Sequence, residues 1–288
     1  MEFEETVGDI TDDPNWLARE IEGHGWVFHM AAVSDYWRKG VEQLYQVNVE
    51  GTKNIAKACR LAGIDRLIFT SSVAAFGIPE KGQVIDENCS FNIRPEKLPY
   101  GHSKYLAELE VAKAIDNGLD AVILNPTITL GPRDVNMISG SIITEAARGL
   151  VRFNLPGGGN FVGVEDVVRG HLAAAANGQN GENYILAGEN LSHKEVGLMV
   201  FEALGRPQPR LDVPTWFLPL AAVGVEAIRV FLGHRVPVDG NQVRLAGLKL
   251  YADGQKAKDA FGLETIPIRA VVEDTYQWYK EHGFLKPG

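Results

Sequence analysis

Apolar and polar residues follow one another in blocks that predict an ordered series of strands and helices. Some short runs are almost entirely apolar, as in strands buried on both faces of a parallel sheet. These runs are Trp26–Ala32, Arg66–Ser72 and Ala121–Asn125. Between them, helical spacing of apolar residues predicts helices over 41–62 and 100–116. Alternating strands and helices indicate right-handed βαβ units, and therefore an α/β fold with a doubly wound parallel sheet.

The remaining pattern predicts shorter elements and a second, smaller lobe. Val7–Ile10 has the composition of the tail of a strand, and Asp12–Pro14 is typical of a helix start. Pro156–Asn160 resembles a phosphate-binding loop, but strand-like residues follow it where such a loop would open a helix, so we interpret it as a turn. Further elements are expected as a helix from Glu165, a strand at 183–188, a mostly helical proline-containing lobe over 191–249, and a C-terminal helix over 268–282.

Composition and charge restrict the function further. The chain has 288 residues and a net charge of −9, without a long basic run, which argues against nucleic acid as its main partner. The spacing of its 2 cysteines suggests neither a zinc site nor a disulfide framework, so a reducing cytoplasm is the default location and no metal is expected. The acidic first residues do not resemble a signal peptide.

The most apolar stretch begins at Trp216. Pro219 interrupts this stretch and Glu226 follows it, so the sequence does not predict a membrane-spanning helix. Trp216, Leu220, Val223 and Ala227 instead fall at helical spacing, and we expect this side of a helix over 216–232 to face a ligand cleft or the other lobe. A helix on a membrane surface is the alternative.

Candidate chemistry centres on Tyr100 and Lys104. They are 4 positions apart, so a helix places both side chains on one face, where an ammonium favours the phenolate form of a tyrosine. A tyrosine tuned in this way can exchange a proton with a carbonyl or alcohol oxygen. The alternative is an ordinary exposed pair. Ligands of such sheets bind at the carboxyl ends of the strands, where Ala31-Ala32, Ser71-Ser72 and Pro126-Thr127 are expected to converge.

These motifs, in this order, resemble the extended short-chain dehydrogenases, the group of NAD-dependent epimerases and dehydratases. The similar segments are Phe28–Ala32, Asn48–Asn54, Thr70–Gly77, the Tyr100/Lys104 pair and Asn125–Pro132. Within the group, residues 34–37 and 188–192 are most similar to dihydroflavonol-reductase-like members, and hopanoid-associated sugar epimerases are the closest pattern. The resemblance implies a Rossmann-like domain over 1–136 and about 160–188, a substrate lobe over about 137–159 and 189–260, and a C-terminal helix within 261–288 that packs on the core.

The resemblance also implies roles for individual residues. Tyr100 would be the general acid/base, Lys104 would favour its phenolate and bind the ribose of NAD or NADP, and Ser72 would hold the substrate oxygen. The carboxylate of Asp9 would accept a hydrogen bond from adenine, with a turn cap as the alternative. The expected cofactor-binding set is Asp9, Ile10, Ala31, Ala32, Thr70, Tyr100, Lys104, Pro126 and Thr127. Asn48 is expected to be structural, and the alternative is that it orders a proton-relay water.

The chain departs from the family pattern at its start. The glycine-rich turn for the cofactor pyrophosphate is not present, so a block of roughly 60 residues, with the first two strands, is expected to be missing before Val7. Trp26–Met30 would then form an exposed sheet edge, and the chain would bind cofactor weakly and associate, for instance as a homodimer.

Three functions remain open from the sequence. The first is an epimerase or dehydratase acting on the hydroxyl or keto group of a sugar or sugar nucleotide. The second is a dihydroflavonol- or 3β-hydroxysteroid-like ketone reductase. The third is a truncated, non-catalytic remnant that binds a partner.

Overall fold

The computed structural model describes residues 4–35, 40–80, 82–232, 236 and 238–285. Tyr36 and Trp37, which contribute to the finer family resemblance, lie outside this part. The chain forms two compact units. The first comprises Met1–Gly77, Cys89–Asn125 and His171–Tyr184, and the second comprises Ile78–Asn88, Pro126–Gly170 and Ile185–Gly288. Residues 78–88, 126–136, 160–170 and 185–188, expected in the cofactor domain, belong to the second unit instead. The functional division into cofactor and substrate parts stays a prediction.

The predicted parallel sheet is present and has the strand order β1-β2-β3-β6. These strands are Trp26–His29, Arg66–Thr70, Ala121–Pro126 and Asn183–Leu186. β1 pairs in parallel with β2, with Trp26 opposite Arg66, and β2 pairs in parallel with β3. β3 is buried along its whole length, as its apolar run predicts. β1 differs from the prediction of burial on both faces, because it is an edge strand and only His29 in it is buried. Its exposed edge matches the expectation for Trp26–Met30.

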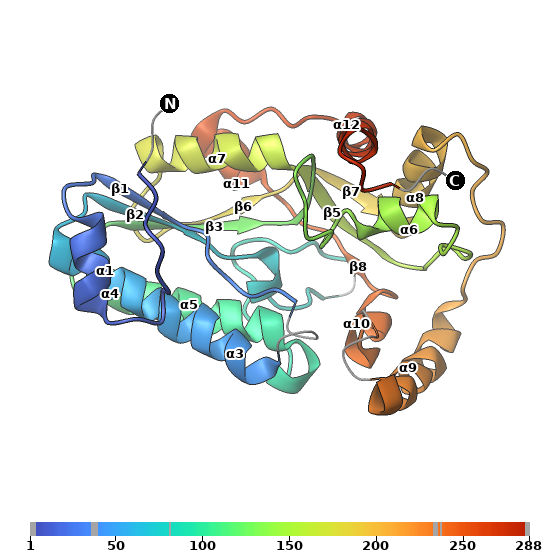
Figure 1. The fold of residues 1–288 in the computed structure, drawn as a ribbon, viewed down its shortest axis with the longest axis horizontal. Coiled ribbons are helices and arrows are strands. Elements are labelled where there is room, and N and C mark those ends of the chain that lie inside the picture. Colours follow the sequence, from blue (N-terminus) through green and yellow to red (C-terminus); the bar gives the residue numbers. More distant parts are fainter. Residues whose placement is uncertain (1–3, 36–39, 81, 233–235, 237, 286–288) are drawn as a thin grey trace. The chain divides into compact units, whose positions relative to one another are not determined.

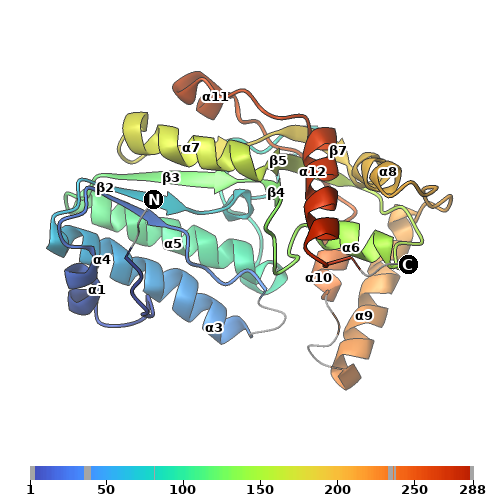
Figure 2. The ribbon, with the colours of Figure 1, turned by 45° about the horizontal axis from the view of Figure 1, so that its top comes forward.

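Helices cover both faces of this sheet (Figures 1 and 2). On one face lie α1 (Pro14–Ile21), α3 (Val41–Tyr45), α4 (Thr52–Ala62) and α5 (Pro99–Asp116), and on the other lies α7 (Val164–Asn177), which enters the first unit at His171. A π-helical turn, η1 (Gln46–Gly51), joins α3 to α4, so the helix predicted over 41–62 is continuous apart from this bulge. Short 3-10 turns occur at η2 (Val73–Ala75) and η3 (Pro95–Lys97). Apolar side chains from α1, α4, α5, β2 and β3 form the core.

One sequence expectation for the first unit is wrong and another is confirmed. Val7–Ile10 forms no strand, because the carboxylate of Asp9 accepts hydrogen bonds from the backbone N–H and the hydroxyl of Thr11, each at 2.8 Å, and so starts a turn. The helix predicted over 100–116 is confirmed as α5. Leu109 in its apolar stripe is exposed, whereas the packed side carries Lys104 and Ser103 beside small apolar residues.

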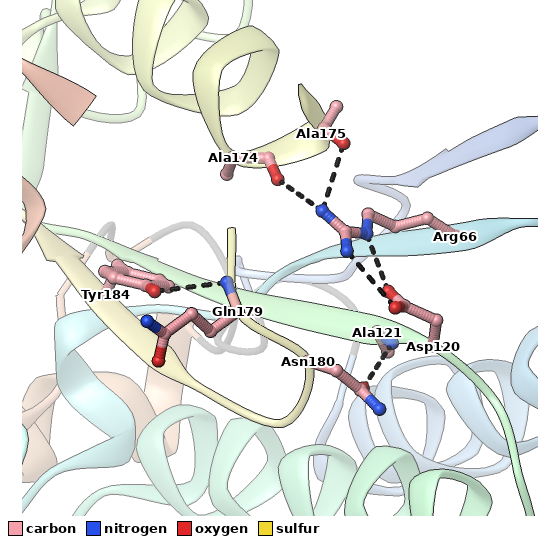
Figure 3. A network of polar contacts seen from close by, with 8 residues as sticks. All are labelled: Arg66, Asp120, Ala121, Ala174, Ala175, Gln179, Asn180 and Tyr184. Carbon is pink, nitrogen blue, oxygen red and sulfur yellow. Dashed lines mark hydrogen bonds and ion pairs between the residues drawn. The ribbon is translucent and has the colours of Figure 1, made fainter. Parts of the chain in front are cut away.

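Arg66 joins three elements at the amino ends of the strands (Figure 3). Its Nε donates to Oδ1 of Asp120 at 2.6 Å and its NH2 group donates to Oδ2 at 3.1 Å. Its NH1 group donates to the carbonyls of Ala174 and Ala175 in the last turns of α7, at 3.3 and 3.2 Å. The fork of the guanidinium matches both oxygens of a carboxylate, so this residue fixes β2 to the start of β3 and to α7.

The second unit contains a small mixed sheet and most of the remaining helices. Its strands are β4 (Ile128–Leu130), β5 (Gly158–Gly163), β7 (Glu189–Ser192) and β8 (Lys249–Leu250), and its order is β4-β5-β7 with β8 on β5. Its helices are α6 (Ser141–Ala147), the start of α7, α8 (His193–Ala203), α9 (Leu218–Leu232), α10 (Gly240–Leu245), α11 (Gln255–Phe261) and α12 (Ile268–Glu281), with the 3-10 turn η4 (Thr215–Phe217). The prediction of a mostly helical segment over 191–249 is confirmed.

Two local predictions for this unit hold. The segment at Pro156–Asn160 is not a phosphate loop, since β5 begins at Gly158, and only Pro156 and Gly157 precede the strand. Gly157 has a φ of +82°, and an added Cβ would lie 2.4 Å from the carbonyl oxygen of Leu248, so only glycine fits. The C-terminal helix α12 packs on α8 and β5, with Tyr279 fully buried.

Candidate active site

Helix α5 carries Tyr100, Lys104 and Glu108 on one face, since each is 4 positions from the next. Pro99 occupies the first turn of the helix, where a missing N–H costs nothing. Gly101 permits a close approach to the segment that follows β2, because an added Cβ would lie 2.3 Å from the carbonyl oxygen of Ala74. This contact brings the start of α5 against the turn that begins at Ser72.

Tyr100 and Ser72 meet at the carboxyl end of β2. Their side chains share a hydrogen bond, and Ser72 Oγ also accepts from the backbone N–H of Ala74 at 3.2 Å. Burial raises the pKa of Tyr100 above its ordinary value, and the hydrogen bond with Ser72 opposes this. The expected role of Lys104 in favouring the phenolate of Tyr100 stays a prediction. At neutral pH Tyr100 is a phenol and not a phenolate.

Lys104 is a buried amine held on the backbone of β2. Its Nζ donates to the carbonyl oxygen of Thr70 at 2.8 Å and lies 5.1 Å from the centroid of the Phe69 ring. Burial lowers the pKa of Lys104 to about 8, and the negative charge of Glu108 opposes this. The ammonium has three N–H donors. Within the described part of the chain, it uses one of them.

Glu108 is a functional candidate that the sequence reasoning missed. Its Oε1 accepts from Ser71 Oγ at 2.5 Å and from Asn125 Nδ2 at 2.6 Å, and its Oε2 accepts from Asn183 Nδ2 at 3.2 Å. Burial raises the pKa of Glu108, while these hydrogen bonds and the charge of Lys104 lower it. The available signal was the spacing of 4 from Lys104, which places opposite charges on adjacent turns.

Asn125 connects this carboxylate to the Ser72 turn. Its Nδ2 also donates to the carbonyl oxygen of Ser72 at 3.1 Å, besides its hydrogen bond to Glu108. The backbone position of Ser72 is thus tied to Glu108 through one amide group. Tyr100, Ser72, Lys104 and Glu108 therefore form one linked cluster in the first unit.

Asn48 supports the start of α5 from the π-helical turn. Its Oδ1 accepts from the backbone N–H of Val33 at 2.7 Å, and its Nδ2 donates to the carbonyl oxygen of Val33 and to Ser103 Oγ, both at 2.9 Å. Its amide group is therefore engaged by protein partners on both its oxygen and its nitrogen. This agrees with the expected structural role and not with a proton-relay role.

The other residues expected to bind the cofactor differ in their exposure and in their hydrogen bonds. Ala31 and Ala32 are exposed just after β1, and Ile10 is half-buried with its carbonyl accepting from Asn54 at 3.3 Å. Asp9 is exposed and its carboxylate is bonded to Thr11, which agrees with the turn-cap alternative.

Thr70, Pro126 and Thr127 are the remaining residues of the expected cofactor-binding set. Thr70 Oγ1 shares a hydrogen bond of 2.8 Å with His171 Nε2. Pro126 and Thr127 belong to the second unit, where Thr127 Oγ1 donates to Asn160 Oδ1 at 2.8 Å. They are not part of the cluster within the first unit. Among the described residues, no group of three or more His, Cys, Asp or Glu side chains could hold a metal ion.

Comparison with known proteins decides the family. The sequence profile of the NAD-dependent epimerase/dehydratase family matches residues 4–187. The chain belongs to this family. A "Putative dihydroflavonol 4-reductase" of Synechocystis sp. is 37% identical over 97% of this chain and 82% of the relative. "Sterol demethylase protein B" of Methylococcus capsulatus is 29% identical over 99% of this chain and 87% of the relative.

Solved structures of the family have the same fold. The crystal structure of gox2253 has a TM-score of 0.84 at 33% identity, covering 97% of this chain and 85% of that chain. The dTDP-glucose 4,6-dehydratase DesIV from Streptomyces venezuelae has a TM-score of 0.74 at 24% identity, covering 96% and 80%. The predicted Rossmann-like α/β fold is confirmed. As a member of this NAD-dependent family, the chain is an oxidoreductase with a nicotinamide cofactor, which favours an enzyme over a non-catalytic remnant.

Proposed function

We propose that this enzyme interconverts a secondary alcohol and a ketone on a ring-bearing small molecule, with Tyr100 as the general acid/base. The observation that carries the proposal is the buried ammonium of Lys104, held on the carbonyl of Thr70 one helical turn from Tyr100, whose side chain lies beside Ser72. A hydroxyl pair can hold a substrate oxygen and exchange a proton with it. Because burial keeps Tyr100 protonated at neutral pH, the free protein is prepared to donate a proton to a ketone.

The cluster is suited to a nicotinamide cofactor. When bound, this cofactor supplies the hydride donor or acceptor. Lys104 is the residue that would hold its ribose, since Nζ is anchored on Thr70 and has further donors for the two hydroxyls of the sugar. The exposed Ala31 and Ala32, with their small side chains, leave space at the end of β1. Glu108 keeps a negative charge near Lys104 and so favours its protonated form.

For the substrate, we propose a dihydroflavonol- or sterol-like ring ketone. Support comes from the curated relatives, whose names include a putative dihydroflavonol 4-reductase and sterol-4-alpha-carboxylate 3-dehydrogenase, the latter 29% identical over 94% of this chain. A sugar or sugar-nucleotide epimerase is the second candidate. It is supported by the family profile, and several solved structures of the same fold are named as sugar epimerases or dehydratases.

Substitution of Tyr100 by phenylalanine tests the chemistry. Tyr100→Phe removes only the hydroxyl, so turnover is expected to fall by at least about 100-fold while the melting temperature is kept. Tyr105→Phe is the matched control, because Tyr105 lies on the same helix and stacks on Phe91 with ring centroids 5.3 Å apart. The control should keep its turnover. Near-normal turnover of Tyr100→Phe would exclude Tyr100 from the chemistry.

Cofactor consumption separates the two substrate classes. A ring-ketone reductase oxidises NADH or NADPH in step with ketone reduction, and this is the expected result with dihydroflavonol and 3-ketosteroid substrates. A sugar epimerase would instead purify with bound cofactor and convert a sugar nucleotide without net oxidation or reduction. The second result would replace the ring-ketone proposal and leave the role of Tyr100 intact.

A further inference from the structure

The surface of α9 differs from that of an ordinary solvent-facing helix. Trp216, Leu220, Val223 and Phe231 are 72%, 62%, 61% and 87% exposed. With the exposed Ala227, they recur at helical spacing along one side, which we call the outer stripe of α9. The sequence prediction that this side faces a ligand cleft or the other lobe stays a prediction, and within its own unit this side is exposed.

The charged side chains of α9 lie on its opposite, packed side. Glu226 Oε1 accepts from the backbone N–H of Gly240 at 2.6 Å, and the NH1 group of Arg229 donates to the carbonyl oxygen of Val238 at 3.0 Å. Leu218 and Ala222 are buried on this side, where α9 packs on α10 (Figures 1 and 2). The outer stripe therefore carries no charge, which is the reverse of the usual arrangement on a soluble helix.

Two common explanations for such an apolar segment do not apply. Residues Thr215–Leu232 form the one candidate membrane span among the described residues, with a mean hydropathy of 1.5 and 11% of the segment buried. A core helix would be mostly buried, and a signal sequence would lie near the N-terminus. The 18 residues of this segment measure about 27 Å as a helix, which is at the lower limit for a bilayer core of about 30 Å.

We propose that α9 docks this protein on the surface of a lipid bilayer, with its outer stripe inserted at the boundary of headgroups and acyl chains. The uncharged stripe complements an apolar layer. Aromatic side chains stand near both ends of the stripe, as Trp216 and Phe231, and aromatic rings prefer the membrane interface. The net charge of −9 and the lack of a basic residue on the stripe point to insertion by apolar contact and not to attraction by anionic lipids.

A second copy of the chain is a poorer occupant of this surface. Each partner in a stable protein interface buries about 800 Å² of accessible surface. The outer stripe is one side of a single helix, so a dimer of ordinary size would have to extend beyond it, whereas a bilayer surface needs no matching partner shape.

Vesicle flotation with the full chain tests the proposal. The probes are vesicles of phosphatidylcholine alone and of phosphatidylcholine with phosphatidylglycerol, at low salt and at about 1 M salt, where the Debye length falls to about 3 Å. Binding is expected to both vesicle types and to persist at high salt. Val223→Glu combined with Phe231→Glu should reduce binding by at least about tenfold, since two apolar side chains that would enter the bilayer become charged. Leu172→Glu is the matched control on α7, and it should bind like the unchanged chain.

The outcomes that overturn the proposal are specific. These are no binding to either vesicle type, binding that needs phosphatidylglycerol and disappears at high salt, or equal binding by the double variant. A double variant that changes only the oligomeric mass in size-exclusion chromatography would identify a second copy as the occupant. Quenching of tryptophan fluorescence by brominated phosphatidylcholine gives a second readout that does not depend on a charged substitution. It should be largely lost in Trp216→Phe, and unchanged quenching would contradict insertion at this residue.

Discussion

Replacing Arg66 should destabilise the protein more than replacing an ordinary surface arginine. Arg66→Met removes two hydrogen bonds to the carboxylate of Asp120 and two to the end of α7 (Figure 3). The side chains of Arg66 and Asp120 are 17% and 35% exposed, so the pair is neither buried nor freely solvated. The variant leaves a carboxylate and two helix-terminal carbonyls with water as their replacement partner.

The expected loss in the free energy of unfolding lies between the values for a buried and for an exposed ion pair. Breaking a fully buried ion pair costs about 3–5 kcal/mol, and an exposed pair contributes about 0–1 kcal/mol. Hydrogen bonds to charged groups contribute about 1.5–3 kcal/mol each when they are well shielded. With partial exposure of both partners, we expect a loss of about 2–3 kcal/mol in the free energy of unfolding for Arg66→Met.

A double-mutant cycle measures the pair itself. Urea unfolding of Arg66→Met, Asp120→Asn and the double variant gives a coupling energy, for which we expect about 1–2 kcal/mol. The matched control is the exposed pair of Lys53 and Glu50, whose side chains are 54% and 59% exposed and whose coupling should stay below about 0.5 kcal/mol. Equal coupling in the two cycles would refute the claim that Arg66 anchors the strands and α7.

Three further predictions concern the buried titratable residues Lys104, Glu108 and His29. Lys104→Met should weaken cofactor binding and slow turnover together, and a change in only one of them would remove one of its two proposed roles. Glu108→Gln removes the charge that raises the pKa of Lys104, so the alkaline limb of the kcat/KM profile should move to lower pH, and an unmoved limb would contradict this. Burial, assisted by Lys104, lowers the pKa of His29 from 6.5 to about 3. Between these pH values His29 binds a proton in the unfolded chain but not in the folded chain. The free energy of unfolding should therefore fall as the pH drops from 6.5 towards 3. His29→Gln should flatten this fall, measured by urea unfolding across that pH range.

The parallel sheet could be predicted because its strands are long apolar runs with helices between them. The small sheet of the second unit could not, because β4 has 3 residues and β8 has 2, too few to show a period. β8 pairs with Gly158 and Gly159, far away in the sequence, and only the folded chain brings them together. The strand predicted at Val7–Ile10 is absent for another reason. The carboxylate of Asp9 accepts a hydrogen bond from the backbone N–H of Thr11, which stabilises a turn in place of a strand.

The site was predictable as far as it depends on local spacing. Tyr100 and Lys104 follow from helical geometry, and Ser72 follows from the family resemblance. Glu108 did not emerge, because its partners Asn125 and Asn183 are 17 and 75 positions away, and a lone glutamate on a helix is normally a solvated residue. The direction of the Tyr100 pKa also depends on burial, which the sequence does not specify.

The spacing of apolar residues in helix α9 identifies one side of the helix but not the environment of that side. The spacing of Trp216, Leu220 and Val223 identifies one side of a helix, and that side is identical for a helix in a core, in a cleft or on a membrane. What separates these environments is the position of the charged residues relative to the packed side. Glu226 and Arg229 bond to backbone groups beside α10, so the contacts of α10 determine that the apolar side faces outward. Those contacts join residues 14 and 9 positions apart, and the sequence alone does not give their geometry.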